Sequence, residues 1–97
     1  MRVIAKRTLV EFYRIYPDSR GPLEAWYQEA SKAIWQKPQD VKDKYKTASI
    51  VGNNRIVFNI GGNKYRLIVK IEYKIGIVYI RFVGTHKGYD KIKVGEV

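Results

Sequence analysis

The 97-residue sequence contains no cysteine, three prolines, one histidine and no long hydrophobic run. Without cysteine the chain can form neither disulfide bonds nor thiolate metal sites, which fits a reducing compartment. A chain of this length buries roughly two thirds of the surface that its unfolded form exposes, enough for one domain, 1–97, without covalent cross-links. No apolar run approaches the ~20 residues of a membrane span, and no signal-peptide hydrophobic region is visible. We therefore expect a soluble, cytoplasmic protein with no membrane partner.

Acidic residues are also few. Nine Asp and Glu residues stand against 19 Lys and Arg residues, and the formal net charge is +10. Residues 1–48 carry ten basic and six acidic side chains, a net +4, and residues 49–97 carry nine basic and three acidic ones, a net +6. Such an excess favours a polyanionic partner, because the protein otherwise tolerates its own charge repulsion without benefit. A solvated surface that only maintains solubility is the alternative.

The first half of the sequence predicts helices. From Val3 to Tyr16 apolar side chains recur at three- and four-residue spacing, and a proline ends the run. After a turn at 19–22, apolar residues from Leu23 to Ile34 mark one face of a second helix, which closes before Pro38. Residues 39–45 allow a short third helix.

The second half changes to the two-residue period of strands. Three runs rich in β-branched and aromatic residues span 55–60, 64–73 and 77–83. Gly61-Gly62-Asn63 predicts a hairpin turn between the first two runs, and a further short strand is possible at 47–51. The order of elements predicts an α+β fold, in which two N-terminal helices pack on a small antiparallel β-sheet.

Alternation assigns the two faces of this sheet. In the strand 64–73 the apolar odd-numbered residues share one face, and the basic residues share the other. In the strand 77–83 the even-numbered residues from Val78 to Phe82 share the apolar face, whereas Tyr79 and Arg81 share the opposite one. We expect the helices to cover the apolar face.

Residues that pair across neighbouring strands must face the same way, and this condition predicts a register. A four-residue loop between the last two strands satisfies it, placing Lys70 opposite Arg81 and Arg66 opposite Thr85. On this register both arginines and the Thr85-His86 segment converge on the side of the sheet away from the helices. A slip by two residues preserves the same faces.

Two segments carry a specific pattern, residues 57–68 (VFNIGGNKYRLI) and residues 80–90 (IRFVGTHKGYD). The pattern resembles the HigB-type toxins of the RelE superfamily of bacterial toxin–antitoxin systems, and the resemblance extends more loosely over the helices. It implies two N-terminal helices on a small antiparallel sheet, cleavage of mRNA, in related toxins often on the translating ribosome, and neutralisation by a cognate helix-turn-helix (HigA-type) antitoxin. One departure is Gly88, where many relatives carry an acidic residue, and this glycine is expected to loosen the segment.

The same residues are chemically suited to metal-free RNA cleavage. The reaction requires a base for the attacking 2′-OH, cations for the developing phosphorane charge and an acid for the leaving oxygen. His86 is the only histidine and the natural proton carrier; a structural histidine bonded to a loop carbonyl is the alternative. Asp90 either orients His86 or caps the C-terminal turn. Because Asp90 is the only acid near the candidate site, we expect no metal and no cofactor.

Basic side chains supply the cations. Arg66 and Arg81 are predicted to clamp the phosphate, because a guanidinium gives a bidentate grip and stays charged. Ordinary solvated strand residues are the alternative for both. Lys64, Lys70 and Lys87 are expected to position the RNA.

Other polar and aromatic residues have less specific predictions. Tyr89 is predicted to stack on a splayed base or to donate its hydroxyl to phosphate, unless it merely packs on the sheet, and Tyr79 can serve similarly. Asn63 either bonds a base or adopts a left-handed turn conformation, and the turn role is favoured. Trp26 and Trp35 are expected in the core or between helices and sheet.

Three functions fit these observations. The first is an endoribonuclease toxin that uses His86, Arg66, Arg81 and Tyr89. The second is a non-catalytic toxin of the same fold that acts on a protein, for which the histidine and arginines have no use. The third is a basic RNA-binding module, which would present more aromatic residues on a sheet face. Whether the antitoxin covers the basic face or blocks ribosome entry stays open.

Overall fold

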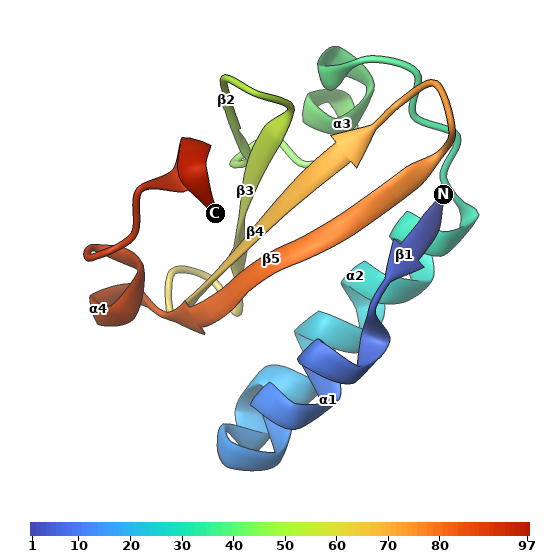
Figure 1. The fold of residues 1–97 in the computed structure, drawn as a ribbon. Coiled ribbons are helices and arrows are strands. Elements are labelled where there is room, and N and C mark those ends of the chain that lie inside the picture. Colours follow the sequence, from blue (N-terminus) through green and yellow to red (C-terminus); the bar gives the residue numbers. More distant parts are fainter.

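The computed structural model describes residues 1–97, which form a five-stranded sheet flanked by short helices (Figure 1). In chain order the elements are β1 (Arg2–Ile4), α1 (Lys6–Ile15), a 3₁₀ turn (Pro17–Ser19), α2 (Arg20–Lys32), α3 (Pro38–Lys44), β2 (Ser49–Val51), β3 (Arg55–Ile60), β4 (Tyr65–Glu72), β5 (Ile77–Thr85), α4 (His86–Tyr89) and a 3₁₀ turn (Val94–Glu96). The strand order is β1-β5-β4-β3-β2. The predicted α+β fold is confirmed.

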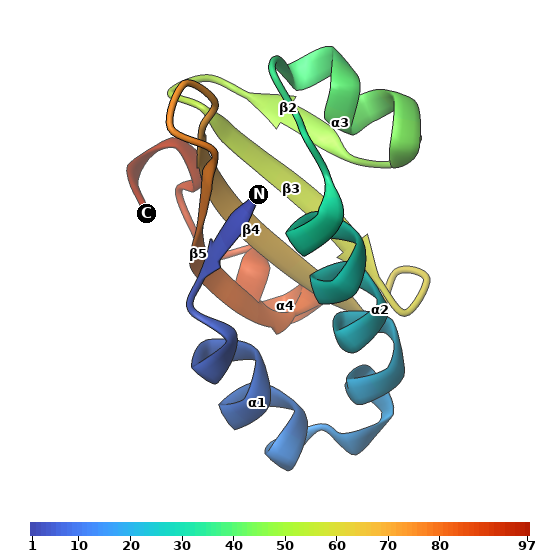
Figure 2. The same ribbon diagram turned by 90° about the vertical axis from the view of Figure 1, so that its right-hand side faces the viewer.

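Helices α1 and α2 cover one face of the sheet and bury the apolar core against it (Figure 2). Leu9 of α1 and Leu23 of α2 are buried against the apolar odd-numbered residues of β4, as the alternation predicted. Trp26 is buried with its ring edge against Phe58, the centroids 5.4 Å apart. Both tryptophans lie in the core cluster, which confirms their expected placement. None of the helices combines the length and the apolar character that crossing a membrane requires.

The predicted helix from Val3 to Tyr16 is wrong at its start, because residues Arg2–Ile4 form β1. This strand runs parallel to the beginning of β5, whereas the other three strand pairs are antiparallel. The sheet is therefore mixed and not purely antiparallel as predicted. The main-chain N–H of Arg2 donates to the Gly76 oxygen at 2.8 Å. A three-residue strand is too short for a periodic signal, and its partner lies more than 70 residues away in the chain.

Helix α2 ends at Lys32, so the predicted extension to Ile34 is also wrong. The amino group of Met1 donates to the oxygens of Ser31 and Ala33, at 3.2 and 2.5 Å. A positive charge at this position satisfies carbonyl groups that the last turn of a helix leaves unpaired. Ala33 is extended (φ −71°, ψ 154°), and Ile34 is 83% exposed instead of lying on a buried helix face.

The pairing of β4 with β5 contains a bulge that alternation did not predict. Between the pairs Val69–Ile80 and Ile68–Phe82, Arg81 has no partner on β4. The predicted pairs of Lys70 with Arg81 and of Arg66 with Thr85 are therefore wrong. Instead Lys70 pairs with Tyr79, and Arg66 pairs with Gly84.

The extra residue reverses the alternation of β5 beyond the bulge, since the side-chain period of a strand is two. Val83 pairs with Leu67 and packs against the core, while Phe82 pairs with Ile68 on the opposite face. The predicted core position of Phe82 is thus wrong. Its ring lies over Gly84, where a Cβ atom would clash with it, so this position requires glycine.

The sheet face opposite α1 and α2 is covered in part by the C-terminal segment, residues 86–97 (Figures 1 and 2). Val57 and Ile68 point to this face and are nevertheless 3% and 0% exposed. Arg55 holds the end of the segment, because its Nε and Nη2 donate to the main-chain oxygen of Val97 at 3.0 and 2.5 Å. The C-terminal segment, which begins with His86, is therefore bound at its other end by the first residue of β3.

Truncation of Leu67 to alanine should destabilise the fold, because this side chain is fully buried between the sheet and the helices. We expect Leu67→Ala to lower the free energy of unfolding by ~2–5 kcal/mol, measured by urea denaturation. Ile50→Ala is the matched control, since Ile50 is 49% exposed on the edge strand β2 and should change stability by less than ~0.5 kcal/mol. Equal losses for the two variants would contradict this assignment of the core.

Candidate active site

The predicted site residues of the two sequence segments meet where β4 begins and β5 ends. Tyr65 pairs with Thr85, and the main-chain N–H of His86 donates to the Lys64 oxygen at 3.3 Å. The Thr85 hydroxyl accepts from the Gly88 N–H at 3.1 Å and so caps the single turn of α4. Sheet pairing and this cap together place α4 beside the start of β4.

Arg66 and Tyr89 form the centre of this cluster. The guanidinium carbon of Arg66 lies 5.6 Å from the centroid of the Tyr89 ring, within the range of a cation–π interaction. Its Nη1 donates to the main-chain oxygens of Asn63 and Tyr65, at 3.1 and 3.2 Å. The Nε and Nη2 groups have no hydrogen-bond partner within the protein, so they can donate to a phosphate.

His86 lies on the exposed side of α4 with Asp90 one helical turn away. Its Nδ1 is 3.4 Å from Asp90 Oδ2, and the two side chains are 54% and 61% exposed. The N–H of Asp90 also donates to the His86 oxygen at 3.1 Å, at the end of the helix. The Asp90 carboxylate lies on the Nδ1 side of the imidazole, so Nε2 is free to meet a substrate. Both roles that the sequence left open for Asp90 are compatible with its position.

Lys64 connects the site to the turn between α1 and α2. Its Nζ lies 2.5 Å from Asp18 Oδ2, and the Tyr65 hydroxyl donates to the other oxygen of the same carboxylate. These two hydrogen bonds lower the pKa of Asp18, and the carboxylate in turn raises the pKa of Lys64. Lys64 is therefore a cation at neutral pH and a poor general base. The contact between Lys64 and Asp18 joins residues 46 positions apart, so no local pattern of the sequence predicts it.

Lys70 and Tyr79 form a separate group further along the sheet. They pair across β4 and β5, and Lys70 also forms an ion pair with Glu72 at 3.2 Å. Lys70 lies four residues from Arg66 on the same strand, a distance of ~13 Å. Arg81 is exposed in the bulge and forms no ion pair or hydrogen bond through its side chain. Of the two arginines predicted to clamp the phosphate, only Arg66 thus lies against α4, where it contacts Tyr89.

The favoured turn role of Asn63 is wrong, because the left-handed conformations of that turn belong to Gly61 (φ 61°) and Gly62 (φ 70°). Left-handed asparagines occur in the preceding turn instead, at Asn53 and Asn54. Glycine adopts these angles without a steric penalty. Lys87 is exposed on α4, beside His86.

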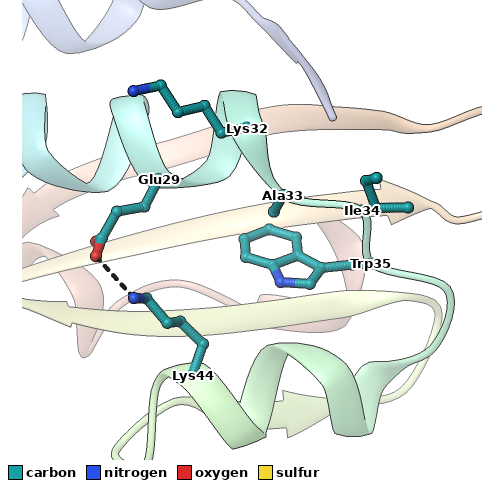
Figure 3. A pocket seen from close by; sticks show the side chains of 6 residues that line it. All are labelled: Glu29, Lys32, Ala33, Ile34, Trp35 and Lys44. Carbon is teal, nitrogen blue, oxygen red and sulfur yellow. Dashed lines mark ion pairs between the residues drawn. The ribbon is translucent and has the colours of Figure 1, made fainter.

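The cluster is a surface and not a cavity. The structure contains three hollows of about 360, 550 and 360 Å³, and none of them is lined by Arg66, Arg81, His86 or Tyr89. The first, between α2 and α3, is shown in Figure 3. An exposed basic and aromatic cluster suits a large anionic partner better than a small molecule, which needs an enclosing pocket.

These features define a small, basic α+β protein with an exposed cationic cluster at the end of a β-hairpin. Residues 19–92 match the family model of HigB toxins, described as the RelE-like toxic component of a toxin–antitoxin system. The chain is 30% identical over 96 residues to the mRNA interferase toxin HigB of Escherichia coli, covering 93% of this chain and 88% of that protein. An mRNA interferase HigB from Shigella flexneri shows the same values, and one from another Escherichia coli strain is 23% identical over 94 residues, covering 95% and 91%. The chain therefore belongs to the HigB toxin family.

The Asp18 contacts predict an acid-dependent loss of stability. A carboxylate whose pKa is lowered by folding stabilises the folded state above its unfolded pKa of about 3.8, and this contribution disappears as the pH falls through the lower folded value. Asp18→Asn removes this titration. The difference in melting temperature between wild type and Asp18→Asn, followed by circular dichroism from about pH 7 to about pH 2, should shrink below about pH 4. A difference that stays constant down to the lowest pH would contradict the assignment.

Proposed function

We propose that this chain is an endoribonuclease that cleaves mRNA. The main support for this proposal is that His86, Arg66 and Tyr89 lie together where β4 begins and β5 ends. In addition, the relatives of this chain are named mRNA interferases. Histidine, arginine and tyrosine are side chains that can move a proton, bind a phosphate and stack on a base. A site that only binds a protein has no need of this combination.

The proposed reaction is an attack by the ribose 2′-OH on the adjacent phosphorus. The new bond joins O2′ to phosphorus, the bond from phosphorus to the 5′ oxygen breaks, and the products are a 2′,3′-cyclic phosphate and a free 5′-OH. His86 Nε2 takes the 2′ proton, and the Asp90 carboxylate near Nδ1 favours the imidazolium that forms. The leaving 5′ oxygen receives a proton from Tyr89 or from water.

Cations stabilise the charge of the transition state in this mechanism. Arg66 offers its unpaired Nε and Nη2 groups to the phosphoryl oxygens, and Arg81, exposed in the bulge of β5 without an ion-pair partner, supplies a second cation. Lys64 acts as a fixed ammonium and not as a base, because Asp18 raises its pKa. His86 is the base in this proposal because it is the only histidine of the chain and the natural proton carrier.

The remaining basic residues position the RNA. Lys70 and Tyr79 lie along the strands at ~13 Å from Arg66, far enough to contact a neighbouring part of the chain of nucleotides. Lys87 follows His86 in α4, and the main-chain oxygen of Asn63 accepts from Arg66, so both residues adjoin the cluster. The net charge of +10 supports this binding, since each neutralised phosphate releases counterions.

We also propose that cleavage takes place on the translating ribosome, in the cytoplasm. The candidate site is an open surface that does not enclose its substrate. A ribosome that holds the mRNA in a fixed path therefore favours the reaction, because it positions the substrate at the site. The family assignment implies an antitoxin partner, and we infer a helix-turn-helix antitoxin of the HigA type from the resemblance of the two sequence segments.

The decisive experiment is induced expression of wild type and His86→Ala, followed by primer extension along a translated reporter mRNA. We expect cuts within the reading frame from wild type and a loss of about 10²-fold or more from His86→Ala, the usual contribution of general acid–base catalysis. Cuts of equal strength from both proteins would move the chemistry to Arg66, Lys64 and Tyr89. Growth inhibition by wild type without any cut mRNA would identify a toxin that acts on a protein.

Arg81→Ala should abolish growth inhibition and leave the fold intact. The side chain is exposed and unpaired, so its removal should change the free energy of unfolding by less than ~0.5 kcal/mol. Arg14→Ala is the matched control, because Arg14 is an exposed arginine on α1 with the same loss of charge. Equal loss of toxicity in both variants would assign the effect to net charge, and an insoluble Arg81→Ala protein would make Arg81 structural.

A further inference from the structure

The hollow between α2 and α3 lies away from the candidate active site and has no role in the proposed reaction (Figure 3). It has a volume of about 360 Å³ and is lined by Glu29, Lys32, Ala33, Ile34, Trp35 and Lys44. The hollow adjoins the C-terminal end of α2, whereas Asp18 meets Lys64 just before its N-terminal end. The length of the helix separates the two regions by ~18 Å.

The hollow is preformed. Trp35, whose ring lies between α2 and α3 in Figure 3, is only 6% exposed and contacts the Tyr45 ring edge-on, with centroids 6.3 Å apart. The Tyr45 hydroxyl donates to Glu29 at 2.6 Å, and Glu29 forms an ion pair with Lys44 at 3.3 Å. These contacts fix the shape of the hollow before any partner arrives, which lowers the entropic cost of binding.

Ile34 stands at the rim with 83% of its surface exposed, more than any other large apolar residue of the chain. Its exposure is imposed by the fold, because the amino group of Met1 ends α2 and leaves Ala33 extended. A large apolar side chain beside a concave surface with a tryptophan floor is typical of an anchor point for a protein partner.

Two lysines that form no ion pair border this hollow. Lys32 lines it and Lys37 lies in the same linker as Ile34; both are exposed and neither forms an ion pair. Glu29 is the one acidic residue of the lining, and its charge is met by Tyr45 and Lys44, whose hydrogen bonds lower its pKa. A complementary partner must therefore bring both an apolar side chain and carboxylates.

We propose that this hollow is a docking surface for the antitoxin, which inserts an acidic segment with one large apolar side chain. The apolar side chain packs on Trp35 against Ile34, and flanking carboxylates face Lys32 and Lys37. The partner class rests on the membership of this chain in a toxin–antitoxin family and not on the proposed RNA cleavage.

The test measures binding of the purified cognate antitoxin by isothermal titration calorimetry. We expect Ile34→Asp to weaken binding by about 30-fold or more, as for an interface hot spot, and Lys32→Glu by about 5-fold with a smaller salt dependence. Ile15→Asp is the matched control, since Ile15 is 73% exposed at the end of α1, and it should bind like wild type. In growth assays the antitoxin should protect cells from wild type but not from Ile34→Asp.

Three results would overturn the proposal. The first is binding of Ile34→Asp at the wild-type affinity. The second is an equal loss of affinity in Ile15→Asp, with melting temperatures unchanged. The third is self-association of the wild type that Ile34→Asp abolishes in gel filtration, which would make a second copy the occupant. Because calorimetry does not depend on cleavage, a chain that cuts no mRNA would still give a valid answer.

Discussion

The pairing of β4 with β5, and the bulge within it, is the constraint on which the rest of the structure depends. Before the bulge, β5 turns Val78 and Ile80 toward the helices; beyond it, Val83 takes over and Phe82 turns to the opposite face. Because of one unpaired residue, β5 contributes apolar side chains to both faces of the sheet. The same pairing sets Tyr65 against Thr85 and so fixes the point at which α4 leaves the sheet. This register therefore places Arg66 of β4 beside His86 and Tyr89 of α4.

The candidate site is supported from both faces of the sheet. On the helix side, Asp18 binds Lys64 and the hydroxyl of Tyr65, so the turn between α1 and α2 holds the start of β4. On the other side the C-terminal segment lies against the face to which the buried Val57 and Ile68 point (Figure 1), and its last residue is bound by Arg55. A short helix of four residues has little stability of its own, since helix nucleation is costly. Its position therefore depends on these tertiary contacts.

The molecule places two surfaces of different chemistry at the two ends of α2. Near the first turn of the helix lies a cluster rich in arginine, lysine and tyrosine, which suits an RNA. Near the last turn lies a tryptophan-floored hollow beside an exposed isoleucine, which suits a protein. Both are basic, in keeping with a net charge of +10, but only the second combines charge with an apolar anchor. Charge alone thus does not distinguish the two partners, and local shape does.

The sequence by itself determined the fold class, the three long strands, their turns and the residue types of the site, because period, glycine turns and a lone histidine are local signals. The sequence also predicted that Arg66 lies near the segment that contains His86, although the predicted register of β4 and β5 is wrong in detail. It did not determine β1, the end of α2 at Lys32, the bulge at Arg81 or the binding of Lys64 by Asp18. Each of these depends on contacts between residues far apart in the chain, whose free energy decides between local conformations that the sequence leaves nearly equal.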